Sequence, residues 1–185
     1  MKKRIAALLA CLLAASCAFG ALADDMLAWD TGSIPVIDYG ADSQLTDKYG
    51  TYYVGNCFDH NASTTWAEGV SGHGIGSFIW GEWRVNRGTW LLKGVAIWGG
   101  YHKSDDVYYK NNRPCEVEVG IYCDGMSETI SARLYDSRTC QLIYFDEPQV
   151  FYNRAEVSLT IDSVYMGSKY SDTCVTDIDL IVEPY

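Results

Sequence analysis

Alternation of apolar and polar residues is the feature that most constrains what this chain can fold into. The clearest case is "CEVEVGIYC", Cys115–Cys123, in which every second residue is apolar. Successive side chains of a β-strand point to opposite faces of a sheet, so this pattern predicts a strand with one face in the core. No stretch has an amphipathic helical pattern of comparable strength. The sequence therefore predicts a chain built mainly of strands.

Similar stretches recur roughly every ten residues, and turn signals such as "CDGMS" and "YDSRT" separate them. They are rich in Val, Ile, Tyr and Thr, which favour strands. Many short strands predict an all-β fold, an antiparallel sandwich or barrel. The predicted strands are Gly94–Gly99, Cys115–Cys123, Thr129–Tyr135, Gln141–Phe145, Ala155–Val164 and Val175–Val182; Gln44–Tyr49 suggests one helical turn.

The N-terminus has the pattern of a secretory leader. Three basic residues, Lys2, Lys3 and Arg4, precede the apolar stretch 5–15, and Ala21-Leu22-Ala23 is a small-x-small cleavage site. We expect residues 1–23 to be a signal peptide of bacterial type, residues 24–48 an N-terminal segment that packs on the domain, and residues 49–185 the β-sandwich domain.

This leader predicts a secreted, periplasmic or cell-envelope protein. Its apolar stretch is shorter than the ~20 residues that a transmembrane helix needs, so we expect no membrane span. An alternative is a lipoprotein processing site at Ala14-Ala15-Ser16-Cys17, which would anchor the chain through Cys17.

The charge of the chain argues against nucleic acid as a partner. The formal net charge is −10, and removal of the basic leader makes the mature chain more acidic still. Such a chain is repelled by DNA, RNA and anionic lipid unless its basic residues cluster tightly.

Catalytic patterns are weak in this sequence. The histidines His60, His73 and His102 lack metal-protease spacing, and the serines lack a G-x-S-x-G elbow. The acid pairs Asp105/Asp106 and Asp177/Asp179 are paired in sequence only, and such acids are usually solvated. We therefore expect no enzymatic activity.

Aromatic residues give the positive signal for binding. Six tryptophans and fourteen tyrosines stand in a chain of 185 residues. We expect Trp66 and Trp98 to fill the core, whereas "SFIWGEWRVNRGTW" mixes tryptophan with arginine and asparagine, so Trp80 and Trp83 are candidates for a binding surface. Flat aromatic faces beside hydrogen-bonding side chains are what a carbohydrate site requires.

A second binding signal is the stretch "GYHKSDDVYYKNNRP", Gly100–Pro114. It lies between two predicted strands and is longer than most connections, and long connections in compact domains are often functional. We predict a recognition loop here. Its tyrosines would stack on a ligand, and its lysine, asparagines and arginine would bind hydroxyl or carboxylate groups.

Oxygen-bearing side chains gather in "CFDHNASTTW", Cys57–Trp66. Asp59, Asn61 and Thr64 offer the hard oxygen ligands that calcium prefers. The same residue types also form turns by bonding their own backbone, so both readings stay open here.

Three ordered stretches resemble a known family: "CFDHNASTTWAEGVSGHGIGSFI", "AIWGGYHKSDDVYYKNNRPCEVEV" and "VYMGSKYSDTCVTDIDL". Together they are similar to the NADase-type glycan-binding domain, a discoidin-like branch of the galactose-binding jelly-roll superfamily. The similarity runs from about Tyr49 to Ile181. It implies a jelly-roll β-sandwich of about eight strands that binds glycans without catalysis, and no NADase activity is implied for this chain.

The resemblance also implies sites. A structural Ca²⁺ would bind Asp59, Thr64 and Asp177, although Asp177 stands where the related pattern tends to have glutamate. A glycan or glycoconjugate would bind at the recognition loop. Trp80 and Trp83 lie on a segment that the family pattern does not fix, and they are candidates for variable specificity. The candidate ligand-binding residues are Trp80, Trp83, Tyr101, Lys103, Tyr108, Tyr109, Asn111, Asn112, Arg113 and Asp172.

Five cysteines follow the leader, so some should pair in an oxidising compartment. The ends of two predicted strands would let Cys123 bridge Cys140. The resemblance implies that the loops of Cys57 and Cys174 approach each other, which would leave Cys115 unpaired.

Two alternatives to a secreted, non-catalytic glycan-binding module remain. One is a protein–protein interaction module on the same scaffold, which would hold an exported protein. The other, which the sequence favours less, is a small glycoside hydrolase.

Overall fold

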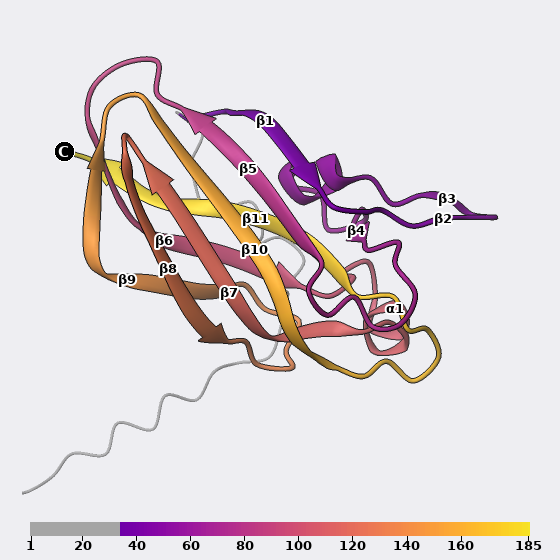
Figure 1. The fold of residues 1–185 in the computed structure, drawn as a ribbon. Helices are drawn as coiled ribbons and strands as arrows, with labels where there is room; N and C mark the ends of the chain where they lie inside the picture. Colours follow the sequence, from indigo (N-terminus) through magenta and orange to yellow (C-terminus); the bar gives the residue numbers. More distant parts are fainter. Residues whose placement is uncertain (1–33) are drawn as a thin grey trace, which may run out of the picture.

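Two antiparallel sheets face each other in the computed structural model, which describes residues 34–185. Figure 1 shows the two layers. The first sheet has the order β1-β5-β10-β7-β8. Its strands are β1 (Val36–Ala41), β5 (Phe78–Arg84), β10 (Arg154–Tyr165), β7 (Arg113–Cys123) and β8 (Met126–Arg133).

The second sheet has the order β4-β11-β6-β9. Its strands are β4 (Trp66–Ala67), β11 (Cys174–Pro184), β6 (Trp90–Gly99) and β9 (Gln141–Phe151). A separate hairpin joins β2 (Thr46–Asp47) to β3 (Gly50–Thr51), and the short helices are η2 (Val54–Phe58) and α1 (Asp105–Lys110). Eight strands have six or more residues, so the predicted jelly-roll sandwich of about eight strands is confirmed.

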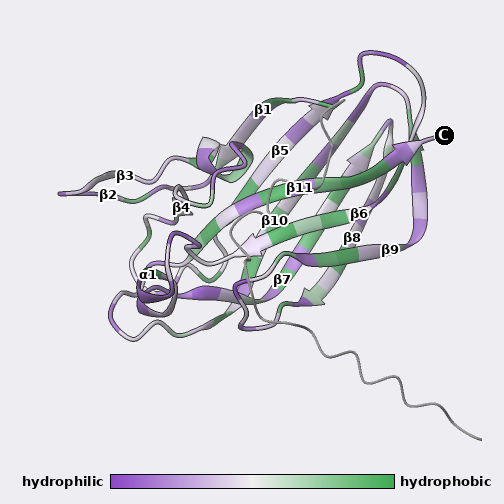
Figure 2. Cartoon of the chain, turned by 180° about the vertical axis from the view of Figure 1, so that it is seen from behind, coloured by the Kyte–Doolittle hydropathy of each residue, from purple (hydrophilic) through white to green (hydrophobic). Residues whose placement is uncertain are grey.

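The core lies between the sheets because alternate residues of each strand point inward. On β10, Ala155, Val157, Leu159 and Ile161 are buried, and the residues between them are partly exposed. Figure 2 shows this alternation as hydrophobic and hydrophilic bands along the strands. Burial of such side chains contributes roughly 25 cal/mol for each Å² of apolar surface removed from water.

The two tryptophans expected in the core are buried, as predicted. Trp66 belongs to the main core between the sheets. Trp98 packs instead in a second, smaller cluster with Ala96 and Ile181, on the opposite face of β6 and β11 from the main core.

All six predicted strands are present, most of them longer than expected. Strand β5 was missed, because its residues Phe78–Arg84 mix aromatic, glycine and charged side chains without a clear alternation. The predicted helical turn at Gln44–Tyr49 is wrong. There the chain forms the β2–β3 hairpin, in which the Asp47 carboxylate accepts the Tyr49 N–H at 2.7 Å and Gly50 takes a φ of 138°.

The stretch Gly100–Pro114 is not a simple loop, because it contains helix α1. Ser104 caps this helix by accepting the Val107 N–H, and Asp105 and Asp106 stand in its first turn, where the helix dipole favours negative charge. Lys110 forms an i,i+4 ion pair with Asp106. These local signals are visible in the sequence, and the prediction of a loop overlooked them.

The predicted signal peptide and residues 24–33 lie outside the described residues. Of the predicted N-terminal segment, Val36–Ala41 forms β1 and pairs with β5, so this part is an edge strand of the sandwich. Within residues 34–185, no helix has the length and apolar character needed to cross a membrane.

Loops gather at one end of the sandwich. The β2–β3 hairpin, α1 and the β10–β11 loop lie at this end, and the C-terminus lies at the other (Figure 1). The segment Gly100–Pro114, which contains α1, carries seven of the ten residues that the sequence predicted to bind a ligand.

Candidate functional site

Asn112 and Arg113 bind neighbouring loops. The Asn112 side chain donates to the Ser171 carbonyl at 2.6 Å, lies 3.0 Å from His73 Nδ1, and accepts the Gly167 N–H at 2.7 Å. The Arg113 guanidinium, also buried, binds Asp136 and the carbonyls of Asn111 and Met166. These two residues therefore join loops to one another, and the prediction that they bind a ligand is wrong, because their polar groups are buried and already paired.

Two predicted stacking residues are also buried. Trp83 is 1% exposed and packs edge-on against Phe58, with ring centroids 5.7 Å apart. Tyr108 is 0% exposed and lies under the Arg113 guanidinium. Neither ring has a face open to a ligand, so both predictions are wrong. In each case burial of the aromatic ring in the core is more favourable in free energy than its exposure at the surface.

Trp80 is partly exposed on β5. It points to the outer face of the five-stranded sheet and pairs with Gly40 on β1 and Ser158 on β10. A Cβ atom at Gly40 would lie 2.7 Å from the indole Nε1, so the absence of a side chain there makes room for the Trp80 ring.

Tyr101 lies at the loop end with part of its ring exposed. Its hydroxyl donates to the Ser63 carbonyl at 3.0 Å, and its ring meets Tyr52 edge-on, with centroids 6.3 Å apart. Burial raises the pKa of Tyr52, and Asp47, Tyr101 and Asp172 raise it further, which places these groups within electrostatic reach of one another.

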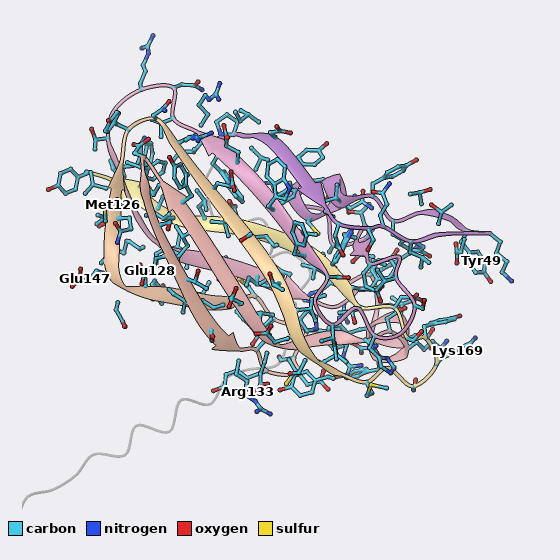
Figure 3. All side chains as sticks on the ribbon, viewed as in Figure 1. Tyr49, Met126, Glu128, Arg133, Glu147 and Lys169 are labelled. Carbon is cyan, nitrogen blue, oxygen red and sulfur yellow. The ribbon has the colours of Figure 1, made fainter. Side chains whose placement is uncertain are left out.

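Two more tyrosines flank this pair. Tyr49 is 74% exposed at the tip of the β2–β3 hairpin, with Lys48 over its ring at 4.8 Å. Tyr170 is 39% exposed on the β10–β11 loop, with Lys169 over its ring at 5.0 Å. A hydrogen bond with Tyr170 raises the pKa of Lys169, and Tyr49 adds to the shift. Figure 3 shows Tyr49 and Lys169 at the same end of the molecule.

We call this surface the tyrosine end. It consists of Tyr49, Tyr52, Tyr101, Tyr170, Lys169 and Asp172. Of these, the sequence predicted Tyr101 and Asp172 and missed the others. The stretch "GSKYSDT" contains Lys169, Tyr170 and Asp172, and could have identified two of the missed residues.

Three other predicted residues lie beside this surface. Lys103 is exposed, and Tyr109 is half-exposed with its ring edge-on to Tyr108. Asn111 is partly buried and caps α1, because its side chain donates to the Val107 carbonyl at 2.7 Å. Lys103 and Tyr109 stay candidates for ligand contact.

The residues predicted to bind calcium do not fit a metal ion. The Thr64 hydroxyl donates to both Asp59 oxygens, at 3.0 and 2.8 Å. Asp177 accepts the Ile178 N–H with Oδ1, and its Oδ2 faces His60 Nδ1 at 3.3 Å. Calcium takes six to eight oxygen ligands, whereas residues 34–185 contain no group of three acidic, histidine or cysteine side chains suited to a metal.

The five cysteines of residues 34–185 carry free thiols in the structure, so neither predicted disulfide is formed. Cys123 ends β7 beside Met126, whereas Cys140 packs against the outer cluster of Ala96, Trp98 and Ile181. The Cys57 thiol donates to the Val175 carbonyl, and burial raises its pKa.

Two clefts of about 370 Å³ lie elsewhere, between the edge strands β8 and β9. One is lined by residues that include Met126, Glu128 and Glu147, which Figure 3 labels. The other lies near Tyr135 and Cys140. The tyrosine end is thus an open surface of rings, and neither cleft contains any of its residues.

Each histidine is already engaged. His60 binds Asp177, His73 binds Asn112, and His102 is buried with Nε2 3.0 Å from the Gly99 carbonyl. Burial lowers the pKa of His102 to about 4, so its imidazole stays neutral. Proton transfer by a histidine would require one of these contacts to break.

Solved structures share this fold at low sequence identity. The family 32 carbohydrate-binding module of C. perfringens NanJ, in complex with galactose, is 14% identical, with a TM-score of 0.54 over 81% of this chain and 99% of that one. A putative chitobiase fragment from Bacteroides thetaiotaomicron is 12% identical, with a TM-score of 0.57 over 84% and 92%. At these identities the likeness concerns the fold alone. A search of curated proteins gave no match.

The sequence also matches a family profile over most of its length. The match covers residues 29–181, from before β1 into β11, and so includes every segment of the tyrosine end. The two-sheet fold is consistent with this family match. The chain belongs to the discoidin-like family of NAD glycohydrolase translocation F5/8 type C domains.

Proposed function

We propose that this chain is an exported, non-catalytic module that binds a glycan at the tyrosine end. The observation that carries the proposal is the grouping of Tyr49, Tyr52, Tyr101 and Tyr170 beside Lys169 and Asp172. Aromatic rings stack on the C–H faces of sugars, and an ammonium and a carboxylate bond the hydroxyl groups around them.

The fold and the leader support this proposal. The NanJ module of the same fold was solved with galactose. The N-terminal signal pattern supports export to the cell envelope or beyond. A shallow surface with few polar groups favours weak binding of a single sugar. Several copies of the module that bind the same glycan-bearing surface would bind more tightly together.

A glycan array tests the proposal directly. We would compare residues 24–185 as wild type, Tyr52→Ala and Tyr101→Ala, with Tyr144→Ala as the control. Tyr144 is 55% exposed on β9, outside the tyrosine end, so its loss removes an exposed ring without touching the proposed site.

We expect selective glycan binding by the wild type and the control. Loss of one stacking ring costs roughly 1 kcal/mol, which weakens binding several-fold. Equal weakening by Tyr144→Ala would overturn the assignment of the site. A blank array with folded wild-type protein would reject glycan binding and favour the protein-interaction alternative, which a pull-down from the cell envelope would then test.

A further inference from the structure

We infer that the His60 side chain takes the place of the structural calcium ion, so that an imidazole supplied by the chain itself holds the loop 59–64 on β11. The resemblance implies calcium at Asp59, Thr64 and Asp177. The geometry at these residues points to the imidazole of His60 there instead.

Two buried carboxylates lie beside His60. Asp177 and Asp179 are 1% and 2% exposed, and both lie on the face of β11 opposite the main core. Buried carboxylates are costly unless a cation or several donors compensate them. His60 Nδ1 lies 3.3 Å from Asp177 Oδ2 and 4.0 Å from Asp179 Oδ2. The imidazole thus lies within reach of both carboxylates.

The backbone of His60 is arranged for this contact. His60 has a φ of 52°, a left-handed conformation that few residues other than glycine adopt and that histidine tolerates better than most. The ring is about half-exposed, and its Nδ1 faces Asp177 Oδ2 at 3.3 Å. This contact joins the exposed loop to a buried carboxylate of β11.

The remaining predicted ligands are occupied by one another. Asp59 accepts the Thr64 hydroxyl with both oxygens and the Asn61 N–H with Oδ1. These bonds form a turn in which side chains bond one another and the local backbone. The stretch therefore follows the turn interpretation of the sequence and not the calcium-site interpretation. A metal ion between Asp59 and Asp177 would have to displace both this turn and the His60 ring.

This replacement also concerns the tyrosine end. The loop that His60 fixes presents the Ser63 carbonyl, which accepts the Tyr101 hydroxyl at 3.0 Å. His60 is therefore a positioning residue for Tyr101. This inference concerns the metal and does not require that the ligand be a glycan.

Calcium titration of residues 24–185 is the first test. We expect no change in the melting temperature with excess calcium or with EDTA. We also expect no luminescence from terbium, a calcium mimic that nearby tyrosine or tryptophan rings excite when it is bound. A saturable rise in melting temperature with calcium, reversed by EDTA, would overturn the inference.

Substitutions at His60 form the second test. His60→Asn removes the imidazole and keeps a residue that tolerates positive φ. We expect it to lower the melting temperature and, because Asp177 loses its contact with the ring, to create stabilisation by calcium that the wild type lacks. Ser63→Ala is the matched control, because the Ser63 side chain is exposed in the same loop. A melting temperature for His60→Asn equal to that of the control would contradict the role of His60.

A double-mutant cycle keeps the inference testable if His60→Asn folds poorly. Asp177→Asn removes the same ion pair from the other side and can still accept the Ile178 N–H. We expect His60→Asn to change the melting temperature much less in the Asp177→Asn background than in the wild type. Additive effects of the two substitutions would show that the residues are not coupled and would overturn the inference.

Discussion

Arg113 and Asp136 form a two-bond ion pair beneath the tyrosine end. Nε donates to Oδ1 at 3.0 Å and Nη2 donates to Oδ2 at 2.7 Å. The pair joins the start of β7 to the β8–β9 loop. The aromatic rings of Tyr108 and Tyr109 both lie within cation–π distance of the Arg113 guanidinium. A residue that resembles a ligand-binding arginine in the sequence thus holds two loops together.

This relationship predicts a large stability effect at Arg113. A lysine there cannot reproduce the planar two-bond geometry and leaves part of Asp136 unpaired. We expect Arg113→Lys to lower the free energy of unfolding by about 2 kcal/mol, measured by urea unfolding. The control is Arg133→Lys, whose solvent-exposed pair with Glu116 should contribute much less to stability. Similar losses at both arginines would contradict a special role for Arg113.

The two tryptophans of β5 should respond in opposite ways. Trp83 is in the core, so Trp83→Ala should cost about 3–5 kcal/mol of unfolding free energy through lost burial and the cavity left behind. Trp80 lies on the outer face of the sheet, so Trp80→Ala should cost less and leave glycan binding unchanged. Urea unfolding and the glycan array measure the two effects. Loss of binding with Trp80→Ala at unchanged stability would place the site on the sheet face.

Buried His102 predicts a loss of stability in acid. Burial lowers its pKa from an unfolded value of 6.5 to about 4; the Gly99 carbonyl opposes the shift and Arg138 adds to it. The unfolded chain therefore binds the proton first, so this contribution to stability falls as the pH drops from 6.5 towards 4, by at most about 3 kcal/mol.

A neutral replacement isolates this effect from the other acid-sensitive groups. His102→Gln removes the titration, so the stability difference between wild type and variant should shift in favour of the variant between neutral pH and pH 4. Urea unfolding at both pH values measures it. A difference that does not change with pH would contradict a neutral, buried His102.

Close packing at Gly167 predicts a coupled loss of stability and binding. A Cβ atom there would lie 2.4 Å from the Lys110 carbonyl oxygen and 2.5 Å from the Asn111 carbonyl carbon. We expect Gly167→Ala to push the β10–β11 loop off α1 and to cost about 1–3 kcal/mol of unfolding free energy. Glycan affinity should fall with it, because this loop carries Lys169, Tyr170 and Asp172.

The neighbouring Ser168→Ala is the control for this prediction. The Ser168 backbone bonds the Tyr109 carbonyl, and its side chain is exposed, so the alanine variant should behave as the wild type in urea unfolding and on the array. A Gly167→Ala variant with unchanged affinity would show that the loop position does not matter for binding.

The sequence by itself determined six of the eight strands of six or more residues within 34–185. A period of two residues is a local property, so the inward faces of β7, β10 and β11 could be predicted residue by residue, and Trp66 and Trp98 were correctly expected to be buried. The same local approach failed where the pattern was mixed, as in β5, or where capping signals inside a polar stretch were overlooked, as in α1.

Only the tertiary structure decided which of these polar and aromatic side chains are buried and which stay exposed. Tyr108, Asn112 and Arg113 have the chemistry of a binding site, but segments distant in the sequence pack over them and use their polar groups. The same holds for the expected calcium site, where His60 meets Asp177 across most of the chain. The burial of these side chains and the pairing of their polar groups arise from contacts between distant segments. A local pattern of residues does not specify those contacts.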